Sequence, residues 1–229
     1  MTVYAGYSEA GIPIKAVLFD MDGVLLDSEP LHVKINSEIY RELGIVVDDT
    51  MVREFVGRTS NDRWTRIIDR FHLKNTVEEL NDWQWTALIA ALQDSGLGPS
   101  EGLDVLLAFL KENHIRATIG SASKGTFVEA VIDYLQLRSD MEGSTTGDEV
   151  IHCKPSPDIF LLAAKKLGVN PSQCLVIEDS SAGVSAGKAA GMYVVGYDNP
   201  TSPGQDLSKA DKTVTNLAAV CKILSELNA

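Results

Sequence analysis

The stretch Lys15-Ala16-Val17-Leu18-Phe19-Asp20-Met21-Asp22-Gly23 decides the fold of this chain. Residues 16–19 form a continuous apolar run, which is typical of a central strand in a parallel sheet that helices cover on both faces. Similar runs occur at 115–120, 174–177 and 192–195. Segments with the apolar period of a helix lie at 102–113, 126–135, 158–167, 182–190 and 217–227. This alternation predicts an α/β fold with a doubly wound, Rossmann-like parallel sheet.

The stretch 30–98 interrupts the alternation. It contains helical patterns at 31–43, 49–55, 60–71 and 77–92, without a convincing strand. Pro30 suits the first position of a helix, and Gly98-Pro99 marks a turn back to the sheet. We therefore expect an α/β core made of 13–29 and 99–229. A small all-helical domain, 30–98, is inserted after the first strand, and residues 1–12 form an N-terminal extension.

The composition excludes several classes of function. The 229 residues carry 20 Lys+Arg against 32 Asp+Glu, a formal net charge of -12, and 45% of them are hydrophobic. An acidic surface repels nucleic-acid backbones and anionic membranes, and no apolar run approaches the roughly 20 residues of a membrane span. Three scattered cysteines do not make a disulfide framework. We expect a cytoplasmic protein without nucleic-acid or membrane partners, and we take it to be a monomer.

Polar side chains follow the predicted strands at the end where α/β sheets bind ligands. Asp20 and Asp22 follow the first strand, and Ser121 follows the second. Glu178-Asp179 follows a third, and Lys154 precedes a Pro-x-Pro that begins a helix. Each residue alone is as well explained by a helix cap or a turn. Together they would crowd carboxylates into one crevice, which requires a cation or a proton, and an all-oxygen ligand set suits Mg²⁺.

These residues resemble the four-motif signature of the haloacid dehalogenase superfamily. The motifs are Asp20-Met21-Asp22-Gly23-Val24, Ser121, Lys154-Pro155 and Glu178-Asp179-Ser180, and they occur in this order. The helical insert is similar to the cap of the β-phosphoglucomutase-like branch, and so is the stretch 178–184. The resemblance covers the chain from about Lys15 to its C-terminus.

The resemblance implies a catalytic role for four residues. Asp20 would be the nucleophile that takes a phosphoryl group as an aspartyl-phosphate. Asp22 would be the acid/base that protonates the leaving oxygen and then activates water. Ser121 and Lys154 would hold the oxygens of the transferring group. The Mg²⁺ ligands that it implies are Asp20, Asp22 through its carbonyl, Glu178 and Asp179.

The same resemblance suggests where the substrate binds. Gly23 would let the backbone turn sharply and approach a phosphate. Further candidates lie in the insert and after the second predicted strand: His32, Arg58, Ala122, Ser123 and Lys124. From the residues alone, His32 could equally be a packing histidine and Arg58 a surface arginine.

Three functions fit these features. A phosphosugar mutase of the β-phosphoglucomutase type must hold a second phosphate and keep water away from the phosphoenzyme. In the mutases that the chain resembles, an arginine and a lysine of the cap hold that second phosphate. Here Arg58 is shifted from the position of that arginine, and the helix around Trp83-Gln84-Trp85 offers no lysine. We therefore expect an enzyme, a Mg²⁺-dependent phosphatase (a phosphoric monoester hydrolase) for a small phosphorylated metabolite such as a sugar phosphate. The alternatives are the mutase and a non-catalytic phospho-accepting or metabolite-binding module.

Overall fold

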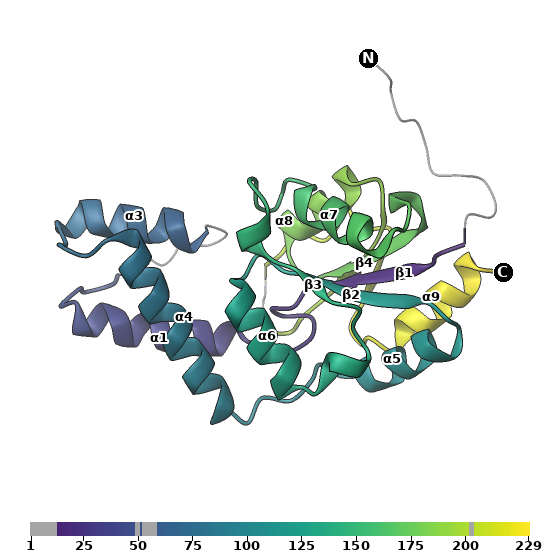
Figure 1. Ribbon diagram of the computed structural model, residues 1–229, viewed down its shortest axis with the longest axis horizontal. Helices are drawn as coiled ribbons and strands as arrows, with labels where there is room; N and C mark the ends of the chain where they lie inside the picture. The colour runs from purple at the N-terminus through teal and green to yellow at the C-terminus, as the bar shows by residue number, and fades with distance from the viewer. Residues whose placement is uncertain (1–12, 49–50, 52–58, 202–203) are drawn as a thin grey trace, which may run out of the picture.

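The computed structural model describes residues 13–48, 51, 59–201 and 204–229. They form a six-stranded parallel sheet in the order β3-β2-β1-β4-β5-β6 (Figure 1). The strands are β1 (Ala16–Phe19), β2 (Arg116–Gly120), β3 (Ser144–Thr145), β4 (Cys174–Glu178), β5 (Tyr193–Tyr197) and β6 (Lys212–Val214). The predicted α/β fold with a doubly wound parallel sheet is confirmed.

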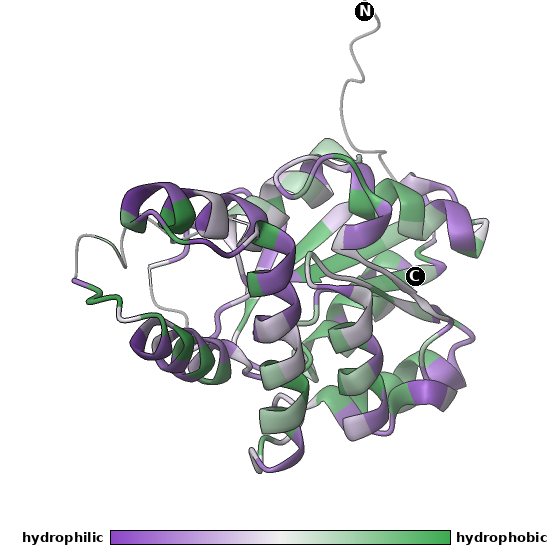
Figure 2. Ribbon diagram, turned by 60° about the vertical axis from the view of Figure 1, so that its left-hand side comes forward, coloured by the Kyte–Doolittle hydropathy of each residue, from purple (hydrophilic) through white to green (hydrophobic). Residues whose placement is uncertain are grey.

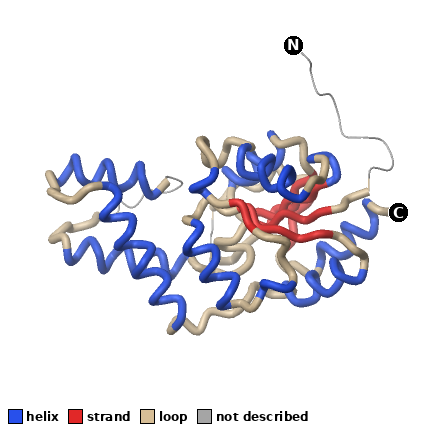
Figure 3. The backbone as a smooth tube through the Cα atoms, viewed as in Figure 1, coloured by secondary structure: helices blue, strands red, loops and turns tan. Residues whose placement is uncertain are grey.

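Strand β1 lies between β2 and β4 in the middle of the sheet, and all four of its side chains are buried. They point alternately to the two faces, as strand geometry requires. Val17 and Phe19 pack on one side, against helices α5 (Leu103–Glu112), α6 (Gly125–Tyr134) and α9 (Ala219–Leu227). Ala16 and Leu18 pack on the other side, against α7 (Asp158–Leu167) and α8 (Ser181–Ala189). The two helical layers lie on opposite faces of the sheet in Figure 3.

The register of the sheet determines where the strand ends meet. Phe19, the last residue of β1, stands level with Ile119 of β2 and Ile177 of β4. The Asp20 amide then donates to the Ile177 carbonyl at 2.9 Å, so the ladder continues one residue beyond β1. The side chains that follow these three strands therefore share one edge of the sheet.

Three further helices lie beyond that edge: α1 (Glu29–Glu42), α3 (Ser60–Phe71) and α4 (Val77–Gln93). They extend away from the sheet in both Figure 1 and Figure 2. They pack through apolar contacts and hydrogen bonds: the Tyr40 ring meets Trp64 edge-on at 5.7 Å, and the Trp64 indole donates to Gln84 at 2.8 Å. The chain leaves the sheet and returns at one place, because Leu26 pairs with Pro99 and the Ser100 amide donates to Leu25 at 2.9 Å. Residues 30–98 remain a predicted domain.

Two strands were not predicted from the sequence. β3 has only two residues, and two of the three residues of β6 are exposed, so neither shows an apolar run. Both strands are at the edges of the sheet. The expected extension at 1–12 lies outside the described residues, as does the expected helix at 49–55 except for Met51.

Within the described residues, no helix combines the length and the apolar character needed to cross a membrane.

Candidate active site

A buried lysine joins the ends of β1 and β4. Lys154, in the loop before α7, donates from Nζ to Oδ1 of Asp20 and to Oε1 of Glu178, the latter at 2.6 Å. Only 8% of its side chain is exposed, and that of Glu178 is fully buried. Burial disfavours the ammonium ion, but the two carboxylates outweigh it and raise the pKa of Lys154. Lys154 therefore carries a permanent positive charge beside Asp20.

Three carboxylates crowd around this lysine. Single oxygens of Asp20, Glu178 and Asp179 all lie within 4.8 Å of one another. Burial, with the negative charges nearby, raises the pKa of Asp20 well above its usual range, although Lys154 acts in the opposite direction. Burial and then the Glu178 charge raise the pKa of Asp179 to about 7. One lysine does not neutralise three buried acids, and hard oxygen donors in such a group fit a Mg²⁺ ion.

Two glycines allow the carboxylates to approach so closely. Gly23 has a φ of +82°, and a Cβ there would lie 2.1 Å from Oδ2 of Asp179. A Cβ on Gly183, in α8, would lie 1.7 Å from Oε1 of Glu178. The other oxygen of Glu178 accepts from the Ser180 amide and hydroxyl, both at 2.9 Å. The backbone therefore forms a close-fitting wall behind the acids.

Asp22 lies in a different environment from Asp20. Its Oδ1 accepts from Ser28 at 2.5 Å and lies 3.4 Å from Nε2 of His32. Its Oδ2 accepts from Ser123 at 2.6 Å. Burial alone would raise the pKa of Asp22, but these contacts, led by His32, lower it to about 2. The Asp22 carboxylate is therefore ionised and turned away from the group of Asp20, Glu178 and Asp179.

The remaining predicted residues have varied positions. The hydroxyl of Ser121 is buried, 3.5 Å from Oδ2 of Asp22, and Ala122 is exposed. His32 also packs edge-on against Trp85 and Phe127. Lys124 forms an ion pair at 2.6 Å with Asp82. Arg58 lies outside the described residues.

Sequence reasoning missed three contributors to the site. Ser28 holds Asp22, and the Asn199 side chain donates to the Gly23 carbonyl at 3.1 Å. Asn199 lies two residues beyond β5, so the rule that found the other strand-end residues could have found it. Asp82 reaches Lys124 from α4. Neither Ser28 nor Asp82 has a motif or a spacing that marks it.

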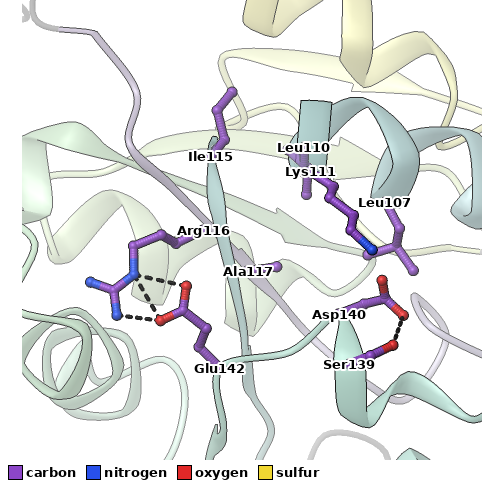
Figure 4. Close-up of a pocket in the computed structure, with 9 residues that line it drawn as sticks. All are labelled: Leu107, Leu110, Lys111, Ile115, Arg116, Ala117, Ser139, Asp140 and Glu142. Carbon is purple, nitrogen blue, oxygen red and sulfur yellow. Dashed lines mark hydrogen bonds and ion pairs between the residues drawn. The ribbon is translucent and has the colours of Figure 1, made fainter. Parts of the chain in front are cut away.

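A separate cavity of about 160 Å³ lies at the opposite end of β2, between that strand and α5 (Figure 4). Its cation Arg116 donates to both oxygens of Glu142 and to the Leu167 carbonyl. No residue of the four motifs lines it. The cavity is therefore not part of the acidic site.

An α/β sheet whose strand ends gather three carboxylates, a buried lysine and a serine defines a class of enzymes that act on phosphoryl or related groups. Residues 14–191 match a family model that is described as "Hydrolase: haloacid dehalogenase-like hydrolase". The chain belongs to this family, and the resemblance seen in its motifs is confirmed.

Relatives in the family include both phosphatases and mutases. The chain is 32% identical to "Fructose-1-phosphate phosphatase YqaB" of Escherichia coli (strain K12), over 78% of this chain and 94% of that protein. It is 32% identical to "Beta-phosphoglucomutase" of Bacillus subtilis (strain 168), over 88% and 89%. A similar solved structure is a CbbY mutant from Rhodobacter sphaeroides in complex with xylulose-(1,5)bisphosphate. It has a TM-score of 0.80 and 26% identity, over 90% of this chain and 95% of that chain.

From the raised pKa of Asp179 we predict how the stability of the metal-free protein depends on pH. In the unfolded chain an Asp ionises near pH 3.9, whereas in the folded protein its pKa is about 7. The folded state therefore binds the proton more tightly, and this contribution to stability is lost as pH rises from about 4 through 7. Thermal melts in EDTA should show Tm falling over this range, and Mg²⁺ should raise Tm most above pH 7. An Mg²⁺ effect that does not grow with pH contradicts the assignment.

Gly23→Ala tests the close approach of backbone and acid. The substitution adds strain at a positive φ and moves the Asp179 carboxylate, so it should abolish the rise in Tm that Mg²⁺ produces. Gly168→Ala is the matched control, because Gly168 has a φ of +65° with nothing within 4 Å of its Cβ position. The control should lose about 1 kcal/mol of stability and keep the Mg²⁺ response. Equal Mg²⁺ responses in the two variants would show that the contact has no role.

Proposed function

We propose that the protein is a Mg²⁺-dependent phosphatase that hydrolyses a small phosphorylated metabolite through an aspartyl-phosphate on Asp20. The observation that carries this proposal is the pairing of Asp20 with buried Lys154 beside Glu178 and Asp179. A carboxylate attacks a phosphoryl group only when positive charge screens their mutual repulsion. The names of the phosphatase and mutase relatives support phosphoryl chemistry, and the names of the YqaB and CbbY proteins suggest a sugar phosphate.

Asp20 would attack the phosphorus while Lys154 neutralises the phosphoryl oxygens. Ser121 follows β2, next to β1, and its hydroxyl, which lies 3.5 Å from Oδ2 of Asp22, would turn to donate to one of those oxygens. The ion would be held by Asp20, Asp179 and the Asp22 carbonyl, with Glu178 beside them. Its positive charge would offset the charge that builds up during transfer. Gly23, with no side chain, would let the backbone pass close to the ion and the phosphate.

Asp22 would carry the proton. With a pKa of about 2, its carboxylate cannot protonate a leaving oxygen while Ser28, His32 and Ser123 hold it. It must leave those partners and turn toward Asp20, where the nearby carboxylates would raise its affinity for a proton. There it would protonate the leaving group, and it would then take a proton from the water that attacks the aspartyl-phosphate. The release of Asp22 is therefore part of the catalytic cycle.

Hydrolysis is favoured over mutase activity by the side chains of α4 that lie near the core. Trp85 packs against His32 and Phe127, and buried Gln84 accepts from Trp64 and Arg63. Residues 83–85 of α4 carry no charge and so provide no cation for a second phosphate, and Arg63 of α3, the cation that contacts them, is held by Gln84. We propose that α1, α3 and α4 form the cap that selects the substrate, with His32, Arg58, Ala122, Ser123 and Lys124 around it. We also propose that the protein is monomeric and cytoplasmic.

Asp20→Asn and Asp22→Asn separate the two carboxylate roles. Asp20→Asn should abolish turnover of every phosphomonoester, because the amide is not a nucleophile. Asp22→Asn should lower kcat by about 10²–10⁴ for alkyl phosphates. The leaving group of p-nitrophenyl phosphate needs no proton, so Asp22→Asn should form the phosphoenzyme from it at a fast rate. Hydrolysis of that phosphoenzyme should still be slow. The two rates together should appear as a burst of p-nitrophenol. Asp94→Asn, at an exposed acid that caps the end of α4, is the control and should leave turnover unchanged. Full activity of Asp20→Asn with any substrate would refute the mechanism.

The fate of the phosphoryl group distinguishes hydrolase from mutase. With β-glucose 1-phosphate and a bisphosphate primer, the phosphatase should release inorganic phosphate and glucose. Formation of glucose 6-phosphate as the main product would establish the mutase instead. Absence of any Mg²⁺-dependent turnover across a panel of phosphomonoesters would favour a binding module.

A further inference from the structure

We propose that Asp82 sets the charge preference of the active site. By pairing with Lys124 it disfavours substrates with a second phosphate and selects phosphomonoesters whose remaining part is neutral and hydroxylated. This inference rests on the proposed function, since it concerns the substrate of the same site. It adds a residue that lies outside the four motifs.

Lys124 is adjacent in sequence to a residue that contacts Asp22. It is the N-terminal cap residue of α6 and follows Ser123, whose hydroxyl donates to Asp22 at 2.6 Å. The first amide of α6, that of Gly125, donates to Asp148 at 2.7 Å. Asp148 accepts at this helix end, whereas the Lys124 ammonium group, which can only donate, reaches across to α4.

Asp82 supplies that contact from α4. The ammonium of Lys124 lies 2.6 Å from Oδ1 of Asp82. Trp85, one turn further along α4, packs against Phe127 of α6 with ring centroids 5.6 Å apart. Figure 1 shows α4 beside α6, and this aromatic contact holds the two helices together. The ion pair therefore bridges the predicted cap and the core next to Asp22.

The pair matters for recognition rather than for folding. The side chains of Lys124 and Asp82 are 32% and 59% exposed, and such solvated pairs add little to stability. Two other cations of the described residues also have acceptors. Lys154 contacts Asp20 and Glu178, and Arg63 donates to Gln84.

A second phosphate that approaches Lys124 would have to displace the Asp82 carboxylate or lie against its negative charge. A sugar hydroxyl meets no such repulsion, because it can donate a hydrogen bond to that carboxylate. The site is therefore suited to a single phosphate on a polyhydroxylated group. Specificity of this kind depends on repulsion of the wrong ligand as well as on attraction of the right one.

Asp82→Asn removes the charge and keeps the size of the side chain. We would measure Ki for fructose 1-phosphate and for fructose 1,6-bisphosphate against p-nitrophenyl phosphate hydrolysis, with Mg²⁺ present. The variant should bind the bisphosphate about two- to fivefold more tightly, the scale of a solvated charge pair, with little change for the monophosphate. Asp94→Asn, an exposed acid at the end of the same helix, is the matched control and should change neither value. In a Lys124→Gln background, Asp82→Asn should lose most of its effect.

The inference is overturned if the ratio of the two Ki values does not change in Asp82→Asn. It is also overturned if Asp94→Asn shifts the ratio equally, if the full shift persists without Lys124, or if Asp82→Asn does not bind the bisphosphate. Titration calorimetry with the same two sugars, in an Asp20→Asn background, measures the preference without turnover. A wild-type protein that hydrolyses no phosphomonoester would therefore refute the proposed function while the charge preference is still tested.

Discussion

The site depends on the balance of buried charge at the ends of β1 and β4. Lys154 lies between Asp20 and Glu178, and all three side chains are almost entirely removed from water. Burying ions is costly, and loss of one partner of a buried pair typically destabilises a protein by about 3–5 kcal/mol. Because Asp179 adds a third acid, the lysine leaves negative charge uncompensated. This uncompensated negative charge would destabilise the metal-free protein. It also makes the site suitable for a divalent cation, and with that cation for a phosphoryl group.

The two aspartates at the end of β1 have opposite properties although one residue separates them. Asp20 continues the ladder of the sheet, whereas Asp22 immediately precedes the turn at 23–25, and its side chain meets Ser28, Ser123 and His32. Burial raises the pKa of Asp20, while hydrogen bonds lower that of Asp22. Under the proposed mechanism, these environments would separate a charge-screened nucleophile from a proton carrier that is at rest. The partners of Asp22 come from both α1 and the segment before α6, so movement between these parts would release it.

The sequence predicted what depends on local pattern. The apolar run 16–19 identified the central strand, because a strand buried on both faces can have no polar alternation. The position of Asp20, Ser121 and Glu178 after such runs indicated that they meet, because the ends of parallel strands share one edge. The sequence could not predict β3 or β6, because these strands have too few buried residues to form a pattern. Nor could it predict that Asp22 turns toward Ser28 or that Asp82 meets Lys124, since these contacts depend on how distant helices pack.

The central claim is that Asp20 carries the phosphoryl group, and the most direct test is to locate that group in the protein. Asp22→Asn protein would be mixed with p-nitrophenyl phosphate and Mg²⁺, quenched in acid, digested and analysed by mass spectrometry. The account predicts one phosphoryl group on the peptide that contains Asp20, and none in a sample that also carries Asp20→Asn. A phosphoryl group on another residue, or turnover in the active protein with no phosphoenzyme in the variant, would contradict it.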